Sequence, residues 1–114
     1  MMTESKIIIN VQLDAEKVPQ QISWSASGST AGDPQKAKAM LLALWDGAEK
    51  SAMRIDLWTK DMMVDEMADF YYQVFVTMAD TFQRATQHTE LTNEIKLFAQ
   101  KFHKKFIEIE EARK

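Results

Sequence analysis

Two different spacings of apolar residues divide this chain, and together they restrict its fold class more than any other feature. Between residues 7 and 26, and again between 53 and 58, apolar side chains occupy alternate positions. From residue 63 onward they recur every three or four positions instead. Alternation is the period of a β-strand with one apolar face, and a spacing of three and four is that of an amphipathic helix. The chain is therefore predicted to be an α+β protein.

The first alternating segment predicts a β-hairpin at about residues 7–26. Ile9 and Val11 stand on one face of its first strand, and Ile22 and Trp24 on one face of its second. Two such runs joined by a short polar connection are typical of antiparallel strands that share a buried face.

A helix is predicted next, at about residues 35–46. Asp33 and Pro34 have the types of an N-cap and a first helical residue, and Gly47 is predicted to end the helix. Its apolar stripe consists of Ala37, Met40, Leu41, Leu44 and Trp45. These positions follow the helical spacing.

The rest of the chain predicts a third strand at about residues 52–59 and helices at about 63–86 and 91–112. The whole chain, residues 1–114, is short enough for a single domain. The expected order is ββαβαα. We expect an antiparallel three-stranded sheet with helices packed on one of its faces.

The third strand carries our candidate contact surface. Arg54, Asp56 and Trp58 alternate with apolar residues and so share one face, and Met62 follows in the next turn. Tryptophan and arginine are the residues most enriched at protein interface hot spots. The four residues are therefore our candidates for a protein-binding site. The alternative is that a helix covers this face and that Arg54 pairs with Asp56 or with an acid that caps the helix.

Four carboxylates near the start of the first long helix raise the question of a metal site. They are Asp56, Asp61, Asp65 and Glu66. Mg²⁺ and Ca²⁺ both take several oxygen ligands, but this spacing matches no calcium loop. We therefore expect Asp61 to cap the helix and the other two helical acids to favour its dipole. No metal and no cofactor is predicted.

Composition excludes further classes of function. The chain has no cysteine, its two histidines lack the spacing of a metal site, and no Gly-x-Ser-x-Gly motif is present, so no catalytic residue is predicted. The net charge of −3 and a pI of about 5.4 disfavour nucleic acid. No apolar run reaches the ~20 residues of a membrane span, and the first residues lack the pattern of a signal peptide. We expect a cytoplasmic, non-enzymatic protein without membrane insertion.

Several runs of the sequence resemble the gliding motility protein GldC family of Bacteroidetes. The runs are Val18–Trp24, Leu44–Asp46, Met53–Met62, Val64–Met67 and Met78–Thr86. Their order and spacing carry the resemblance over nearly the whole chain. It implies an accessory protein of gliding motility, a process tied to type IX secretion, with protein partners in that machinery. It implies no catalytic or ligand residue.

Three molecular roles stay open at this point. The first is an interaction module of the motility machinery, and the second is a chaperone-like binder of extended peptide segments. A divalent-metal-dependent or nucleotide-dependent enzyme is the third. A homo-oligomer is also compatible with the aromatic face of the last predicted helix.

Overall fold

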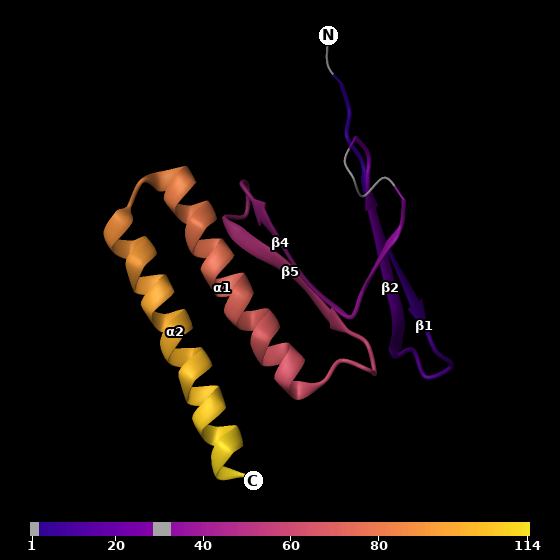
Figure 1. Ribbon diagram of the computed structural model, residues 1–114. Coiled ribbons are helices and arrows are strands. Elements are labelled where there is room, and N and C mark those ends of the chain that lie inside the picture. The colour runs from indigo at the N-terminus through magenta and orange to yellow at the C-terminus, as the bar shows by residue number, and fades with distance from the viewer. Residues whose placement is uncertain (1–2, 29–32) are drawn as a thin grey trace. The chain divides into compact units, whose positions relative to one another are not determined.

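The computed structural model describes residues 3–28 and 33–114, and it confirms the α+β class (Figure 1). The chain forms two compact units, Met1–Met62 and Met63–Lys114. The strands are β1 (Ile7–Leu13), β2 (Pro19–Ala26), β3 (Gln35–Ala37), β4 (Ala39–Asp46) and β5 (Ser51–Trp58). The helices are α1 (Val64–Thr86) and α2 (Thr89–Ala112). All strands belong to the first unit and both helices to the second.

The predicted N-terminal hairpin is confirmed. β1 and β2 pair antiparallel, and β3 adds a third strand on the far side of β2. Ile22 lies at the centre of this sheet, opposite Val11 on one side and Ala37 on the other. Its side chain is 1% exposed, which makes it the one large side chain that is fully buried among the described residues.

The predicted helix at residues 35–46 is wrong, because this segment forms β3 and β4 instead. The residues Ala39–Trp45 are an unbroken apolar run, and such a run satisfies the helical and the strand period equally. Asp33 and Pro34 therefore start no helix. Gly47 belongs to the turn between β4 and β5, where Asp46 Oδ1 accepts the N–H groups of Ala48 at 2.9 Å and Glu49 at 3.1 Å.

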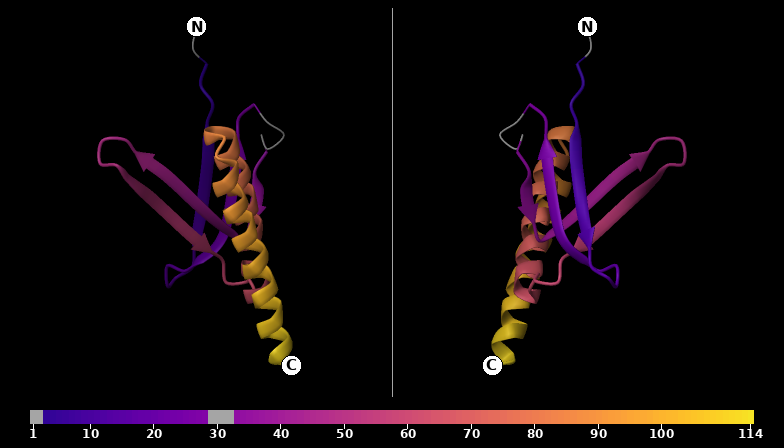
Figure 2. Two further views of the ribbon diagram at one scale, coloured as in Figure 1. Left: turned by 90° about the vertical axis from the view of Figure 1, so that its left-hand side faces the viewer. Right: turned by 90° about the vertical axis from the view of Figure 1, so that its right-hand side faces the viewer.

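The composition of the predicted sheet is also corrected. The strand expected at 52–59 is present as β5, but it pairs with β4 in a separate two-stranded sheet rather than with the N-terminal hairpin. Figure 2 shows β4 and β5 as a hairpin of their own. The chain changes sheets at Lys38, whose carbonyl accepts the Thr59 N–H at 2.8 Å. Packing of helices on a sheet face stays a prediction.

The two long helices are confirmed and form an antiparallel hairpin. Ala79 of α1 and Ala99 of α2 are both fully buried, and their small side chains permit close approach of the two backbones. Phe75 of α1 meets the rings of Phe98 and Phe102 of α2, with centroids 5.4 and 5.3 Å apart. Such edge-to-face pairs stabilise beyond the area they bury.

Polar contacts stabilise the turn that joins α1 to α2. Gln87 adopts a left-handed conformation, with φ of 60°, and its N–H donates to the Gln83 carbonyl. Thr92 is 4% exposed, and its hydroxyl donates to Gln83 Oε1 at 2.8 Å. This turn therefore ends α1 and redirects the chain into α2. Across the described part of the chain, neither helix is long and apolar enough to span a bilayer.

Candidate functional site

β5 has the two different faces that its alternation predicts. Arg54, Asp56 and Trp58, which we call the β5 surface, stand opposite Ala43, Leu41 and Ala39 of β4. The Arg54 guanidinium donates to Asp56 Oδ1 at 3.0 Å, and both side chains stay substantially exposed. Trp58 is 58% exposed. The pairing of Arg54 with Asp56 therefore coexists with an accessible tryptophan.

An apolar hollow of about 250 Å³ adjoins the end of this surface. It is lined by Val18, Pro19, Asp56, Leu57 and Trp58. Val18 directly precedes β2, Pro19 begins it, and the other three residues lie at the end of β5. The two strands belong to different sheets. Sequence reasoning did not find Val18 and Pro19 as site residues, because no local pattern signals a contact between segments about forty positions apart.

Two of the sequence candidates lie outside this hollow. Arg54 lies on the same strand face, two residues further from the hollow than Asp56. Met62 follows in the turn after β5, where its N–H donates to the Thr59 carbonyl at 3.1 Å, and its side chain is partly buried. The β5 surface and the hollow are thus joined through Asp56 and Trp58.

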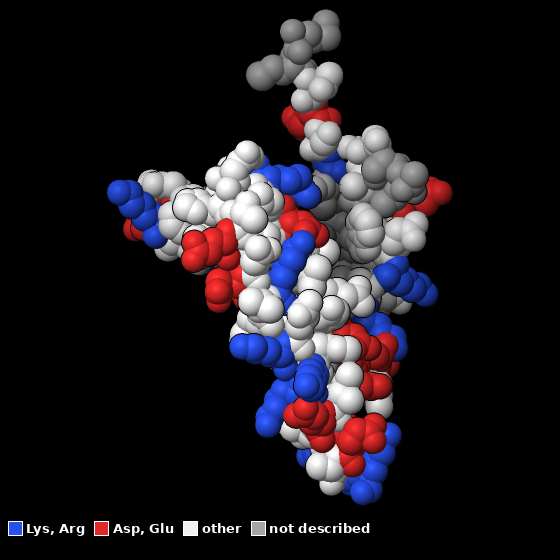
Figure 3. Space-filling view, turned by 60° about the vertical axis from the view of Figure 1, so that its left-hand side comes forward, with Lys and Arg blue, Asp and Glu red and all other residues white. Residues whose placement is uncertain are grey.

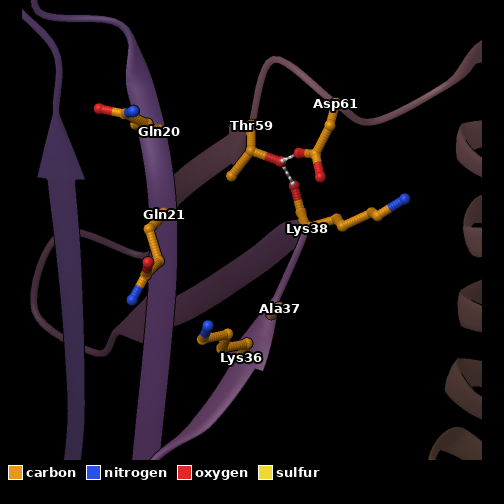
Figure 4. A pocket seen from close by; sticks show the side chains of 7 residues that line it. All are labelled: Gln20, Gln21, Lys36, Ala37, Lys38, Thr59 and Asp61. Atoms are coloured by element: carbon orange, nitrogen blue, oxygen red, sulfur yellow. Dashed lines mark hydrogen bonds between the residues drawn. The ribbon is translucent and has the colours of Figure 1, made fainter.

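A second, polar hollow of about 310 Å³ lies where the chain passes from β3 to β4 (Figure 4). It is lined by Gln20, Gln21, Lys36, Ala37, Lys38, Thr59 and Asp61. Thr59 is 3% exposed, and its hydroxyl lies within hydrogen-bond distance of Asp61 Oδ1 and the Lys38 carbonyl. The hydroxyl has a single proton to donate, and the Asp61 carboxylate is a stronger hydrogen-bond acceptor than the Lys38 carbonyl. The bond from Thr59 lowers the pKa of Asp61, which keeps this carboxyl ionised.

Asp14 ties the β1–β2 turn to the segment that follows β5. Its Oδ1 accepts the N–H groups of Glu16 at 2.8 Å and Val18 at 3.0 Å. Its Oδ2 forms an ion pair with the Lys60 ammonium. The bond from Lys60 and then that from the Val18 N–H lower the pKa of Asp14 from 3.8 to about 2. This pair holds Val18, at the edge of the apolar hollow, near the end of β5.

We expect this ion pair to make stability depend on acid. Because the pKa of Asp14 is lower in the folded chain, its contribution is complete above about pH 4 and is lost as the pH falls toward about 2. Asp14→Asn removes the charge but keeps an oxygen that can accept the turn N–H groups. Melting temperatures of both proteins measured from pH 7 to pH 2 should differ most above pH 4 and converge near pH 2. Parallel curves over this range would contradict the assignment.

The carboxylates at the start of α1 follow the expectation in part: Asp65 and Glu66 lie in the first turn of the helix, but Asp61 does not cap it. Asp61 bonds Thr59 and does not cap the helix, because Met63 occupies the N-cap position. Glu66 accepts the N–H of Met63 at 3.0 Å, and both Asp65 and Glu66 lie where acids favour the helix dipole. Within residues 3–28 and 33–114, no three His, Asp or Glu side chains lie close enough together to hold a metal ion.

Charges on the molecular surface are mixed in sign. On the side drawn in Figure 3, lysines and arginines are interspersed with acids and leave uncharged areas between them. Nucleic-acid binding needs a basic stripe or patch, and the overall charge is −3. The site thus combines an exposed aromatic ring, an ion pair and an apolar hollow.

Comparison with protein families gives a match over most of the chain. The family model described as "Gliding motility-associated protein GldC-like" matches residues 19–108. No curated protein and no solved structure matches the chain. The matched segment includes β2, the whole β5 surface, α1 and all but the last four residues of α2.

Proposed function

The chain belongs to the GldC-like family of gliding motility-associated proteins, and from this premise we propose that it is a non-enzymatic interaction module of the motility machinery. It acts in the cytoplasm, in association with type IX secretion, and binds a protein component of that machinery. The absence of cysteine is compatible with a reducing compartment. The process follows from the family, whereas the molecular role is our proposal.

One observation carries the proposed role: Trp58 is exposed beside an apolar hollow and on the same strand face as the Arg54–Asp56 ion pair. Interface hot spots combine an aromatic or arginine anchor with a pocket that the partner fills. An apolar side chain of the partner would enter the hollow between Pro19 and Trp58. A carboxylate or carbonyl of the partner would accept the guanidinium donors of Arg54 that Asp56 leaves open.

Colony spreading of a gliding bacterium tests this proposal. The bacterium's own copy of the protein is replaced by variants of this chain. We expect Trp58→Ala combined with Arg54→Ala to abolish or strongly reduce colony spreading at unchanged protein level. Truncating one hot-spot residue costs about 2 kcal/mol or more of binding free energy, or roughly a 30-fold loss of affinity. Immunoblotting of the variants separates lost binding from lost protein.

Trp45→Ala is the matched control. Trp45 is 69% exposed and lies on the same face of the same sheet, opposite Ala52, but outside the apolar hollow. It should leave spreading unchanged. A photo-crosslinking residue at position 58 should also capture a protein whose own deletion stops gliding. Normal spreading of the double variant, or equal loss in the control, contradicts the proposal.

A second candidate is a chaperone-like binder of extended segments, and the two hollows favour it. Pro19 lines the apolar hollow, while the next residues, Gln20 and Gln21, line the polar one. β3 pairs with only residues 22–24 of β2, so these hollows lie along the part of β2 beyond that pairing. An extended segment adding at a sheet edge would present alternate side chains to such pockets.

A reduced, alkylated protein that cannot fold is a suitable probe for this second candidate. Binding that is measured by fluorescence anisotropy and weakened by Trp58→Ala would support it. Binding that is absent, or that is unchanged in this variant, would exclude a role of the hollows in holding unfolded chains.

A further inference from the structure

The outer edge of β1 is a long, uncharged strand edge. β1 is the first strand in the order β1-β2-β3, and within the described residues no strand pairs with its other side. Its sequence, Ile-Ile-Ile-Asn-Val-Gln-Leu, contains no charged residue and no proline. Proteins usually protect such edges with charges, prolines or bulges, because an open edge pairs with other strands. The one register shift, between Gln12 and Leu13, leaves the extra residue on β2 and β1 itself regular.

The direction of the backbone groups along β1 follows from its first bonds. The Ser27 N–H donates to the Lys6 carbonyl at 2.9 Å, and the Lys6 N–H donates to Ser27 Oγ at 2.8 Å. The backbone N–H and C=O groups of Lys6 thus point toward β2. In an antiparallel ladder the backbone groups of every second residue point the same way. Ile7, Ile9 and Val11 therefore direct their N–H and C=O groups toward the open edge.

We propose that this edge pairs antiparallel with β1 of a second copy of the chain, around a two-fold axis at Asn10. This register overlaps the whole strand with itself. Ile9 then lies opposite Val11 of the second copy, and Ile7 opposite its Leu13. The two three-stranded sheets become one continuous sheet across the axis.

The pairing is self-complementary in its side chains. Ile7, Ile9, Val11 and Leu13 alternate with Ile8, Asn10 and Gln12, so this register continues the more apolar face of one sheet into that of the other. A register shifted by one residue would pair odd-numbered with even-numbered positions. The apolar residues of one copy would then lie opposite the more polar residues of the other. A surface that must contact an identical surface requires this kind of match to itself.

Charges at the strand ends favour the second copy over an unrelated strand. The same register brings Lys6 opposite Asp14 of the second copy, once at each end of the paired strands. Opposite charges in cross-strand positions are stabilising, and like charges are destabilising. The Asp14 side chain is 16% exposed and already binds Lys60 and two turn N–H groups. A carboxylate has about four acceptor positions, so one position is left for Lys6.

Single cysteines test the register directly, because the chain has none of its own. Asn10→Cys places two thiols opposite each other at the axis, with Cβ atoms about 4.5–5.5 Å apart, close to the about 3.5–4.5 Å of a disulfide. We expect the full-length variant to form a disulfide-linked dimer under mild oxidation. Light scattering of the unmodified chain should also show a dimer that dissociates on dilution.

Ile8→Cys and Gln12→Cys are the matched controls on the same strand face. In the proposed register each lies roughly 14 Å along the strand from its own copy, so neither variant should crosslink alone. Mixed together they should form a heterodimeric disulfide, because Ile8 lies opposite Gln12. A chain that stays monomeric at all concentrations overturns the proposal. So does a solution dimer in which Asn10→Cys crosslinks no better than Ile8→Cys.

Discussion

Replacement of Ile22 by alanine is expected to lower the free energy of unfolding by about 2–5 kcal/mol, the usual cost of truncating a fully buried isoleucine. Ile22 is 1% exposed and stands between Val11 and Ala37 on its two neighbouring strands. The loss combines the transfer free energy of the deleted methyl groups with the cavity that remains. Urea unfolding followed by tryptophan fluorescence measures it, and Ile22→Val should cost about 0.5–1.5 kcal/mol.

Leu44→Ala provides the control for this prediction. Leu44 lies in β4, is 59% exposed and pairs with Met53. Substitutions at exposed positions usually change the free energy of unfolding by no more than about 0.5 kcal/mol. Similar losses in the two alanine variants would mean that Ile22 is not the centre of the sheet's core.

Replacement of Ala79 by leucine is expected to cost about 1–3 kcal/mol of unfolding free energy, because the larger side chain must force α1 and α2 apart. Ala79 and Ala99 are 0% exposed in the helical hairpin, so neither position has room for three more carbon atoms. Alanine and leucine are both strong helix formers, so the loss reports packing rather than helix propensity. Far-UV circular dichroism during urea unfolding measures it.

Ala85→Leu is the control on the same helix. Ala85 is exposed near the end of α1, and leucine there meets solvent. This variant should keep nearly the full stability. If Ala79→Leu is as stable as Ala85→Leu, the two helices do not pack through their alanines.

The secondary structure of most of the chain was predictable from local pattern. The helix predicted at 63–86 is observed at Val64–Thr86, and the last helix begins two residues earlier than predicted. These segments obey only the helical period. The first hairpin obeys only alternation, and Pro19 begins its second strand, where proline is tolerated because its missing N–H matters least there.

The failure at residues 35–46 has a physical cause. Ala39–Trp45 is apolar at every position, so it fits a buried strand and a buried helix alike. The choice depends on the backbone groups of β5, which pair with β4 from Ala39↔Trp58 to Asp46↔Ser51. The sequence of residues 39–45 alone does not indicate that a partner strand follows.

The candidate site divides in the same way. Alternation placed Arg54, Asp56 and Trp58 together on one strand face, and β5 has that face. Local pattern could not predict the ion pair of Asp14 with Lys60 or the place of Val18 and Pro19 in the apolar hollow. Both depend on contacts between segments that are distant in the chain. The capping role expected of Asp61 is wrong, because Met63 is the N-cap of α1 and the Asp61 carboxylate accepts the Thr59 hydroxyl instead.

The sequence by itself determined the α+β class, the first hairpin, the two long helices and the faces of the third predicted strand, because each depends on spacing within one segment. Tertiary structure alone decided that residues 39–46 are a strand, that β4 and β5 form their own sheet, and that Pro19 and Trp58 share a hollow. These outcomes depend on which backbone and side-chain groups meet across the chain. Local periodicity carries no information about such meetings.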